Sequence, residues 1–198
     1  MTTVCVAGLG YIGLPTAAML ASRGFDVVGY DVNEAAVASI NSGKAHFHEP
    51  DLQMLLSAAI STERLRAQSQ PVEADYFIIA VPTPFRDGKK PDMSHVEQAC
   101  DAIAPYLKPG STVILESTSP VGSTELLTSR LAEARPDLVF PRFKEPNDAQ
   151  IAVAHCPERI LPGNMLRELV SNDRIIGGMT DACSRRAVAL YETFVSGH

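Results

Sequence analysis

The stretch "VCVAGLGYIGLPTAAMLASRG", residues 4–24, decides the class of fold. Residues 2–8 are rich in β-branched residues and end in glycine, a pattern typical of a buried strand. Residues 11–24 have the apolar pattern of a helix that stops at a glycine. The stretch therefore predicts a strand, a glycine-rich turn and a helix in direct succession.

The three glycines of the turn, Gly8, Gly10 and Gly13, have the spacing GxGxxG. In such a turn the first glycine permits the sharp bend, the second lets backbone amides approach a pyrophosphate, and the third lets the helix pack closely on the strand. The helix N-terminus adds free amides and a partial positive charge. The spacing alone is a weak signal, but the strand before it and the helix after it supply the required context. We therefore expect a dinucleotide cofactor.

The acidic residue Asp31 ends the next expected strand, residues 25–31. Asp31 lies 18 residues after Gly13, the last glycine of the turn. An acidic residue at about this spacing binds the hydroxyls of the adenine ribose. No Arg or Lys follows before Lys44, so NAD is favoured over NADP. An alternative is that Asp31 caps the helix that begins near Asn33 and that the glycines only form a turn.

The remainder of the chain continues the alternation of strands and helices. Further strands are expected at residues 64–68, 74–82, 111–118, 151–157 and 174–178, and helices at residues 33–43, 49–61, 94–107, 122–134 and 181–195. Residues 64–68 have the character of an edge strand, and residues 86–92 that of a charged, solvated turn. The pattern predicts a Rossmann-type, doubly wound α/β domain whose mainly parallel sheet carries helices on both faces.

The composition limits the possible partners. The chain has 198 residues, a 45% hydrophobic content and a net charge of -6, which gives no electrostatic case for binding nucleic acid or an anionic membrane. The uncharged stretch 4–21 lacks a basic residue before it and contains glycines and Pro15, which argues against a signal peptide or membrane span. We expect a cytoplasmic protein with no nucleic-acid and no membrane partner.

The cysteines and histidines do not suggest a metal site. The four cysteines are widely spaced without a CxxC pair, as expected of free thiols in a reducing compartment. His46 and His48 have no further cysteine or histidine near them in the sequence, so no metal is expected.

Five segments together resemble a known family. Besides residues 8–24 they are "VPTPF" (81–85), "ESTSPVGST" (116–124), "CPERILPG" (156–163) and "DRIIGGMT" (173–180). In this order they are similar to the UDP-glucose/UDP-mannose dehydrogenase family, most closely to its UDP-N-acetyl-D-mannosamine branch. In that family the NAD-binding domain is followed by a dimerising central helix and a UDP-sugar domain.

The resemblance implies that residues 1–198 are an NAD-binding domain, the N-terminal part of a longer dehydrogenase whose central helix and UDP-sugar domain are absent here. The catalytic lysine, asparagine and cysteine of the family match nothing in this sequence. We therefore expect the chain alone to be inactive and compatible with a monomer, and the full-length enzyme to be a homodimer or larger.

The resemblance also assigns cofactor contacts. Tyr11 and Ile12 match residues whose backbone meets the pyrophosphate, and Asp31 matches the ribose ligand. Thr83 and Thr124 match threonines that line the cofactor. For Thr124 the alternative is capping of the helix that begins near it.

Further matches lie near the reacting carbon. Thr118 matches a threonine that positions water or a proton, with β-propensity at a strand end as its alternative. Glu158 matches a catalytic glutamate, and Arg159 and Ile160 match substrate contacts. The alternative is a surface ion pair between Glu158 and Arg159, although neighbours on an extended segment point to opposite sides. Cys156 does not match the family nucleophile and is interpreted as a packed thiol.

The activity implied by the resemblance is oxidation of C6 of UDP-N-acetyl-D-mannosamine to the uronic acid with two NAD+. The alternatives are the same chemistry on UDP-glucose or another UDP-N-acetylhexosamine, and a stand-alone NAD-binding module without turnover. A hydroxy-acid dehydrogenase would share GxGxxG, but the segments 116–124 and 156–163 do not suit it.

Overall fold

A seven-stranded sheet forms the centre of the computed structural model, which describes residues 1–86, 88, 90–143, 145 and 148–197. The sheet strands are β1 (Thr3–Ala7), β2 (Asp26–Tyr30), β3 (Leu65–Gln68), β4 (Tyr76–Ile79), β7 (Thr112–Leu115), β8 (Ala152–His155) and β9 (Gly177–Gly178). Their order is β3-β2-β1-β4-β7-β8-β9, and every pair is parallel except β8 with β9. This confirms the Rossmann-type prediction, including the edge position of residues 64–68.

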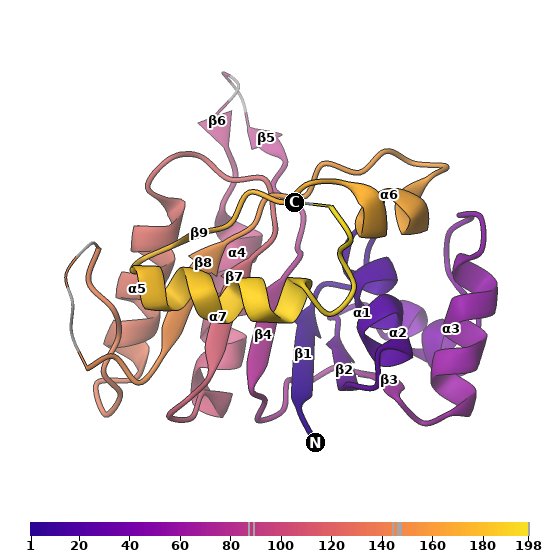
Figure 1. Ribbon diagram of the computed structural model, residues 1–198, viewed down its shortest axis with the longest axis horizontal. Helices are drawn as coiled ribbons and strands as arrows, with labels where there is room; N and C mark the ends of the chain where they lie inside the picture. The colour runs from indigo at the N-terminus through magenta and orange to yellow at the C-terminus, as the bar shows by residue number, and fades with distance from the viewer. Residues whose placement is uncertain (87, 89, 144, 146–147, 198) are drawn as a thin grey trace.

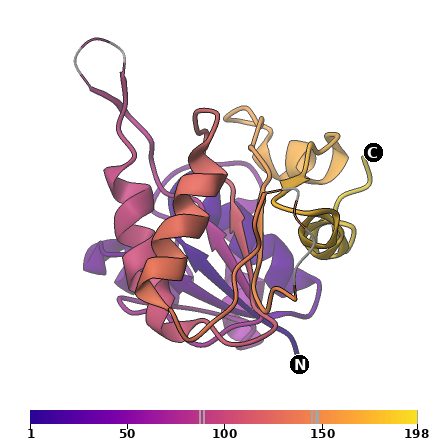
Figure 2. The same ribbon diagram turned by 90° about the vertical axis from the view of Figure 1, so that its left-hand side faces the viewer.

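Helices cover both faces of the sheet (Figures 1 and 2). They are α1 (Gly13–Ser22), α2 (Glu34–Asn41), α3 (Leu52–Ser61), α4 (Ser94–Ile103), α5 (Ser123–Ala134), α6 (Met165–Ser171) and α7 (Asp181–Tyr191). Helices α4 and α5 lie on one face, and α1 and α7 on the other. In β1, Val4 and Val6 belong to one core cluster and Cys5 and Ala7 to the other, because side chains alternate along a strand. No helix in the described ranges is long and apolar enough to cross a bilayer.

Three segments differ from the expectations. The charged segment 86–92 takes part in a hairpin of β5 (Phe85–Arg86) and β6 (Lys90–Pro91), with residues 87 and 89 outside the described part. The helix expected over 94–107 ends at Ile103 and continues as a 3₁₀ turn, Ala104–Tyr106, that contains a proline. Helix α6 was not expected, and it begins next to a carboxylate from a distant loop, described below. Both the hairpin and α6 rise from the edge where the parallel strands end (Figure 1).

The outer edge of β3 is covered by one side chain. The Asn41 amide nitrogen donates to the Ala67 carbonyl at 2.8 Å, and the Asn41 amide oxygen accepts from the Ala67 N–H at 2.8 Å. Asn41 ends helix α2, so this pair also ties α2 to the sheet edge.

Candidate functional site

The glycine turn after β1 has one open position between two crowded ones. Gly8 has a φ of +91°, and a Cβ there would lie 2.7 Å from the Ala80 carbonyl oxygen. A Cβ on Gly13 would lie 1.8 Å from the Gly8 carbonyl oxygen, whereas one on Gly10 would meet nothing within 4 Å. Gly8 and Gly13 thus serve close packing, and Gly10 faces the space where a ligand's phosphates would approach the backbone.

The N-terminus of α1 suits an anion. Its N-cap residue, Ile12, provides no side-chain cap, and the first turn contains no acidic residue. The Leu14 N–H donates to the Gly10 carbonyl at 3.1 Å and Pro15 has no N–H, so this terminus offers a phosphate group the Ile12 and Gly13 amides and its partial positive charge. Tyr11, next to this terminus, is exposed and stacks on Phe47 with ring centroids 4.4 Å apart.

Asp31 links the glycine turn to the following loop. Its carboxylate accepts from the Leu9 N–H at 2.8 Å and from the Asn33 N–H at 2.9 Å. The cap of α2 is Asn33 itself, which accepts from two amides of the first turn, so the alternative that Asp31 caps this helix is wrong. A carboxylate has about four lone-pair positions, which leaves capacity for ribose hydroxyls.

A cleft of about 540 Å³ joins these features. It is lined by Gly8, Gly10, Tyr11 and Ile12 from the turn between β1 and α1, and by Asp31 directly after β2. The residues that follow β4, and helix α4, line the far side. It opens between β1 and β4, where the strand order reverses direction and where doubly wound sheets bind ligands. The glycine turn, the N-terminus of α1 and the carboxylate of Asp31 together fit a dinucleotide.

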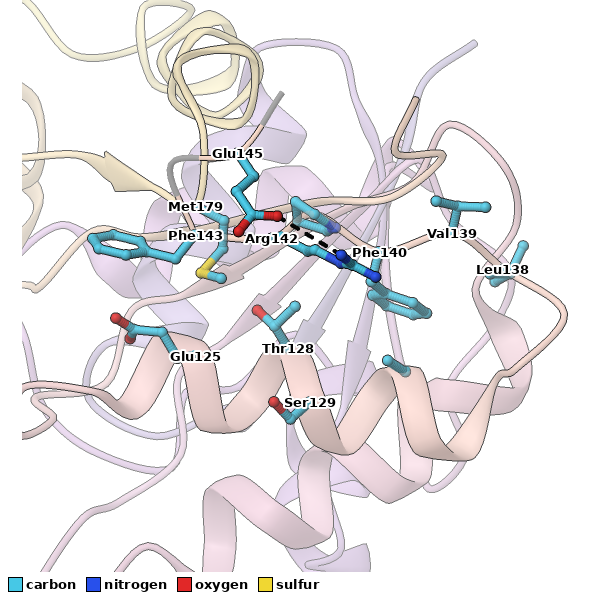
Figure 3. Close-up of a pocket in the computed structure, with 12 residues that line it drawn as sticks. Glu125, Thr128, Ser129, Leu138, Val139, Phe140, Arg142, Phe143, Glu145 and Met179 are labelled. Atoms are coloured by element: carbon cyan, nitrogen blue, oxygen red, sulfur yellow. Dashed lines mark ion pairs between the residues drawn. The ribbon is translucent and has the colours of Figure 1, made fainter. Parts of the chain in front are cut away.

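A larger cleft, about 770 Å³, lies elsewhere, between α5 and residues 138–143 and 145 (Figure 3). Thr128 and Ser129 project from the helix, and Arg142 pairs with Glu145 at 3.8 Å on the opposite side. The described residues that line it include none of the predicted site residues. It offers no cradle of glycine amides and is not the dinucleotide site.

Two predicted site residues meet at the carboxyl ends of β4 and β7. The Thr83 hydroxyl donates to the Thr118 carbonyl at 2.7 Å, so the two loops are linked across 35 residues of sequence. Thr118 is exposed beside this link.

Thr124 lies in the first turn of α5. The helix begins after Gly122 in a left-handed conformation, with no side-chain cap. The neighbouring Ser123 hydroxyl donates to the Pro120 carbonyl at 2.7 Å instead of accepting from an amide. The alternative that Thr124 or its neighbour caps the helix is therefore wrong, and the Ser123 N–H donates to the Pro120 carbonyl at 3.2 Å.

The loop "CPERILPG" turns one charged residue inward and one outward. Glu158 forms an ion pair with Arg174, and the two side chains are only 4% and 5% exposed. Arg159 is exposed, and only its backbone N–H contacts Glu158, at 2.7 Å. A surface pair of Glu158 with Arg159 is therefore not what forms. Ile160 is half-buried against the core.

Cys156 has the environment of a packed thiol. Its side chain is fully buried, and burial raises its pKa to about 12, with the charge of the nearby Glu116 adding to the increase. A thiol held in its protonated form is a poor nucleophile.

Two buried carboxylates were not predicted as functional residues. Glu116, at the end of β7, accepts from the Tyr191 hydroxyl at 3.1 Å and from the Thr16 hydroxyl at 3.4 Å. Glu49 accepts from the Gly163 N–H at 2.8 Å and from the Met165 N–H at 2.7 Å. A carboxylate directly after the apolar residues 113–115 of an expected buried strand was a visible signal for Glu116, whereas nothing near Glu49 in the sequence points to its distant partners.

Nearly the whole chain is similar to known proteins. Residues 2–195 match the model of the UDP-glucose/GDP-mannose dehydrogenase family, NAD binding domain. An NDP-N-acetyl-D-galactosaminuronic acid dehydrogenase of Ralstonia nicotianae is 60% identical over 195 residues. The UDP-N-acetyl-D-mannosamine dehydrogenase of Escherichia coli K12 is 55% identical over 195 residues. In both comparisons the match covers 98% of this chain and 46% of the relative.

Solved structures agree with these relatives. The UDP-N-acetyl-mannosamine dehydrogenase of Staphylococcus aureus superimposes with a TM-score of 0.91 at 40% identity, covering 100% of this chain and 46% of that one. The chain thus spans about half the length of the proteins it matches. Because the family model covers nearly every residue, the chain belongs to the UDP-glucose/GDP-mannose dehydrogenase family, of which it forms the NAD-binding domain.

Proposed function

We propose that this chain is the cofactor-binding part of a longer dehydrogenase that oxidises C6 of UDP-N-acetyl-D-mannosamine to the uronic acid with two NAD+. One observation carries the proposal: the cofactor cleft, the Thr83–Thr118 link and the loop 156–163 all follow the carboxyl ends of the parallel strands. A substrate at this edge would lie between the cofactor and the loop.

Bound NAD+ supplies the hydride acceptor for the substrate carbon. The amides at Gly10, Tyr11 and Ile12 bind its pyrophosphate, and Asp31 accepts the ribose hydroxyls. Thr83 and Thr124 contact the nicotinamide end of the cofactor, which extends beyond the residues that line the cleft.

The substrate side is assigned to the two following loops. Arg159 is exposed and cationic, which suits a charge-assisted hydrogen bond to an anionic or polyhydroxyl substrate, and Ile160 adds an apolar contact. Thr118 positions water or a proton near the reacting carbon. Glu158 acts as the general base, and its ion pair with Arg174 holds the carboxylate in place.

In the proposed reaction a cysteine captures the aldehyde stage, the second hydride transfer gives a thioester, and water hydrolyses it. This chain does not provide such a cysteine in a suitable form. Burial of Cys156 argues against its use, so the nucleophile, with the family's lysine and asparagine, would come from the rest of the enzyme. The chain alone is then expected to bind NAD without oxidising a sugar.

Other sugars are a second candidate. The Ralstonia relative, at 60% identity, is named for N-acetyl-D-galactosaminuronic acid, which supports another UDP-N-acetylhexosamine as substrate. UDP-glucose is the further alternative within the same chemistry. A stand-alone NAD-binding module without turnover is the alternative from a different class.

The test measures NADH formation by the longest natural polypeptide that contains this sequence. UDP-N-acetyl-D-mannosamine, UDP-N-acetyl-D-galactosamine and UDP-glucose are compared at equal concentrations. The proposal expects the highest kcat/KM for the mannosamine sugar, with two NADH formed for each sugar consumed. A preference for another sugar would move the assignment to that substrate. Binding of NADH with no turnover on any of the three would support the module.

A further inference from the structure

Glu116 is a carboxyl group enclosed by protein. It follows β7 at the carboxyl edge of the sheet and is 1% exposed. The Thr16 hydroxyl of α1 and the Tyr191 hydroxyl of α7 contact its two oxygens, at 3.4 Å and 3.1 Å. Glu116 therefore lies between the helix that starts at the glycine turn and the last helix of the chain.

The guanidinium of Arg174 lies in this buried region. Arg174 pairs with Glu158 and also lies over the Tyr191 ring, with its guanidinium carbon 5.5 Å from the ring centroid. Its Nη2 donates to a backbone carbonyl, and its Nε has no hydrogen-bond partner within the described residues. One positive charge cannot neutralise two buried carboxylates, and an unpaired buried charge is costly.

The two carboxyl groups therefore differ in charge. Burial raises the pKa of Glu116 to about 8, and the charge of Glu158 adds to the increase, while Arg174 and the hydroxyls of Tyr191 and Thr16 lower it. Near neutral pH Glu116 carries a proton, and the positive charge of Arg174 is left for Glu158.

We propose that Glu116 is a positioning residue for Glu158: as an uncharged acid between Thr16 and Tyr191, it leaves Arg174 to hold the Glu158 carboxylate in place. The proposal rests on the proposed function only in giving Glu158 a role in the reaction. Through Thr16, the same acid joins the cofactor helix α1 to the loop that carries Glu158.

Ionisation of Glu116 would change the partner of Arg174. An ionised Glu116 would compete with Glu158 for Arg174, because the Nε of Arg174 is without a hydrogen-bond partner within the described residues. Glu158 would then share the positive charge of Arg174 with Glu116. The titratable and charged groups that face Glu116 are Glu158 after β8, Cys156 at the end of β8, Arg174 before β9 and Tyr191 in α7. Burial raises the pKa of the Cys156 thiol and the Tyr191 hydroxyl, so both stay neutral below pH 9.

The pH dependence of stability follows from this arrangement. An unfolded chain loses the Glu116 proton near its ordinary pKa of 4.5, whereas the folded chain keeps it to about 8. Between these values the folded state binds a proton that the unfolded state has released, so stability falls as pH rises. The whole contribution is present below the unfolded pKa and is lost by the time pH has passed the folded one.

The experiment compares wild type, Glu116→Gln and the exposed control Glu133→Gln by thermal denaturation of the 198-residue chain between pH 5 and pH 9. Gln keeps the shape of the neutral acid and has no proton to lose. The difference in Tm, Glu116→Gln minus wild type, should increase between pH 5 and pH 8 and then stay constant. For Glu133→Gln it should stay near zero throughout. A difference for Glu116→Gln that does not change with pH would overturn the proposal.

A second measurement observes the titration in the wild-type chain and uses the variant only to assign the signal. Carboxyl ¹³C NMR of the wild-type chain should show one glutamate that titrates near pH 8, and its signal should be missing from Glu116→Gln. Titration of every glutamate near its ordinary value would overturn the proposal.

Turnover of the longer enzyme separates this proposal from the proposed function. If Glu116 positions Glu158, the wild-type kcat should fall above pH 8, and Glu116→Gln should remove that fall. An unchanged alkaline fall in Glu116→Gln would contradict the positioning role. Full turnover in Glu158→Gln would contradict the role of Glu158 in the proposed function. The measured titration of Glu116 would not be affected by that result.

Discussion

The cofactor cleft is shaped by backbone, whereas the loop at residues 156–163 is held by side chains from distant parts of the chain. In the cleft, Gly10 faces open space, α1 begins without a side-chain cap, and one carboxylate, Asp31, supplies the negative charge. Around the loop, Arg174 binds Glu158 and Glu49 accepts from the turn that follows. Both regions lie at the same edge of the sheet.

The two regions consequently respond differently to change. In the cleft, most side-chain substitutions leave the amides in place, and only added atoms at glycines obstruct them. At the loop, removal of one side chain leaves a buried charge or unpaired amides behind. We therefore expect substitutions near the loop to act on stability, and substitutions in the cleft to act on NAD binding.

The largest expected effect is that of Arg174→Met. It leaves the buried Glu158 carboxylate without its counter-charge and should lower the free energy of unfolding by about 3–5 kcal/mol. Urea denaturation at pH 7 measures it. Arg66→Met, which removes a half-exposed partner of Asp26, is the control and should cost about 1 kcal/mol or less. Equal effects of the two substitutions would show that the ion pair at the loop is no more important for stability than a surface ion pair.

A glycine pair tests the cleft itself. Gly13→Ala places a Cβ 1.8 Å from the Gly8 carbonyl oxygen and should destabilise the chain by about 3 kcal/mol, since rigid backbone must move. Gly10→Ala meets nothing within 4 Å and should leave Tm nearly unchanged while it weakens NADH binding. Thermal denaturation and NADH titration of both variants decide the matter. Unimpaired NADH binding by Gly10→Ala would show that the open space is not the phosphate site.

A smaller effect is expected for Asp31→Ala. Loss of the charged acceptor should weaken NAD binding by about 1–3 kcal/mol, measured by calorimetry. Glu34→Ala removes an exposed carboxylate close to it in the sequence and should not change NAD affinity. Because Asp31 also accepts from two backbone amides, Tm is recorded for both variants. Equal affinities of the wild type for NAD and NADP would contradict the assigned role.

The smallest effect is expected at Cys156. All four cysteines are buried, and burial raises the pKa of Cys156 to about 12 and that of Cys5 to about 11. Iodoacetamide at pH 8 should therefore leave the native chain unmodified and label all four thiols in urea. Rapid labelling of native Cys156, located by peptide mass spectrometry, would return it to consideration as a nucleophile.

The same contrast explains which features could be predicted from sequence. The GxGxxG spacing, the strand before it and Asp31 are local signals, so the position of the cofactor cleft followed from them. The alternation of strand and helix patterns along the chain is also local, and it gave the fold and the order of most elements, although not their exact bounds. Helix α6 and the partners of Glu158 depend on contacts between residues far apart, such as Glu49 with Met165. No local pattern encodes such contacts. Arg174 lies in the segment 173–180 that carries the family resemblance, but that segment does not reveal its ion pair with Glu158.

The side chain of Asn41 has a consequence for how copies of this protein meet. Strand β3 ends one side of the sheet, and an open strand edge is a template on which another chain can add a strand. Asn41 occupies both the donor and the acceptor of Ala67, in the interior of β3. On the opposite side, β9 has only two residues. Little continuous edge is left for intermolecular pairing, which helps to protect a sheet of apolar strands from aggregation.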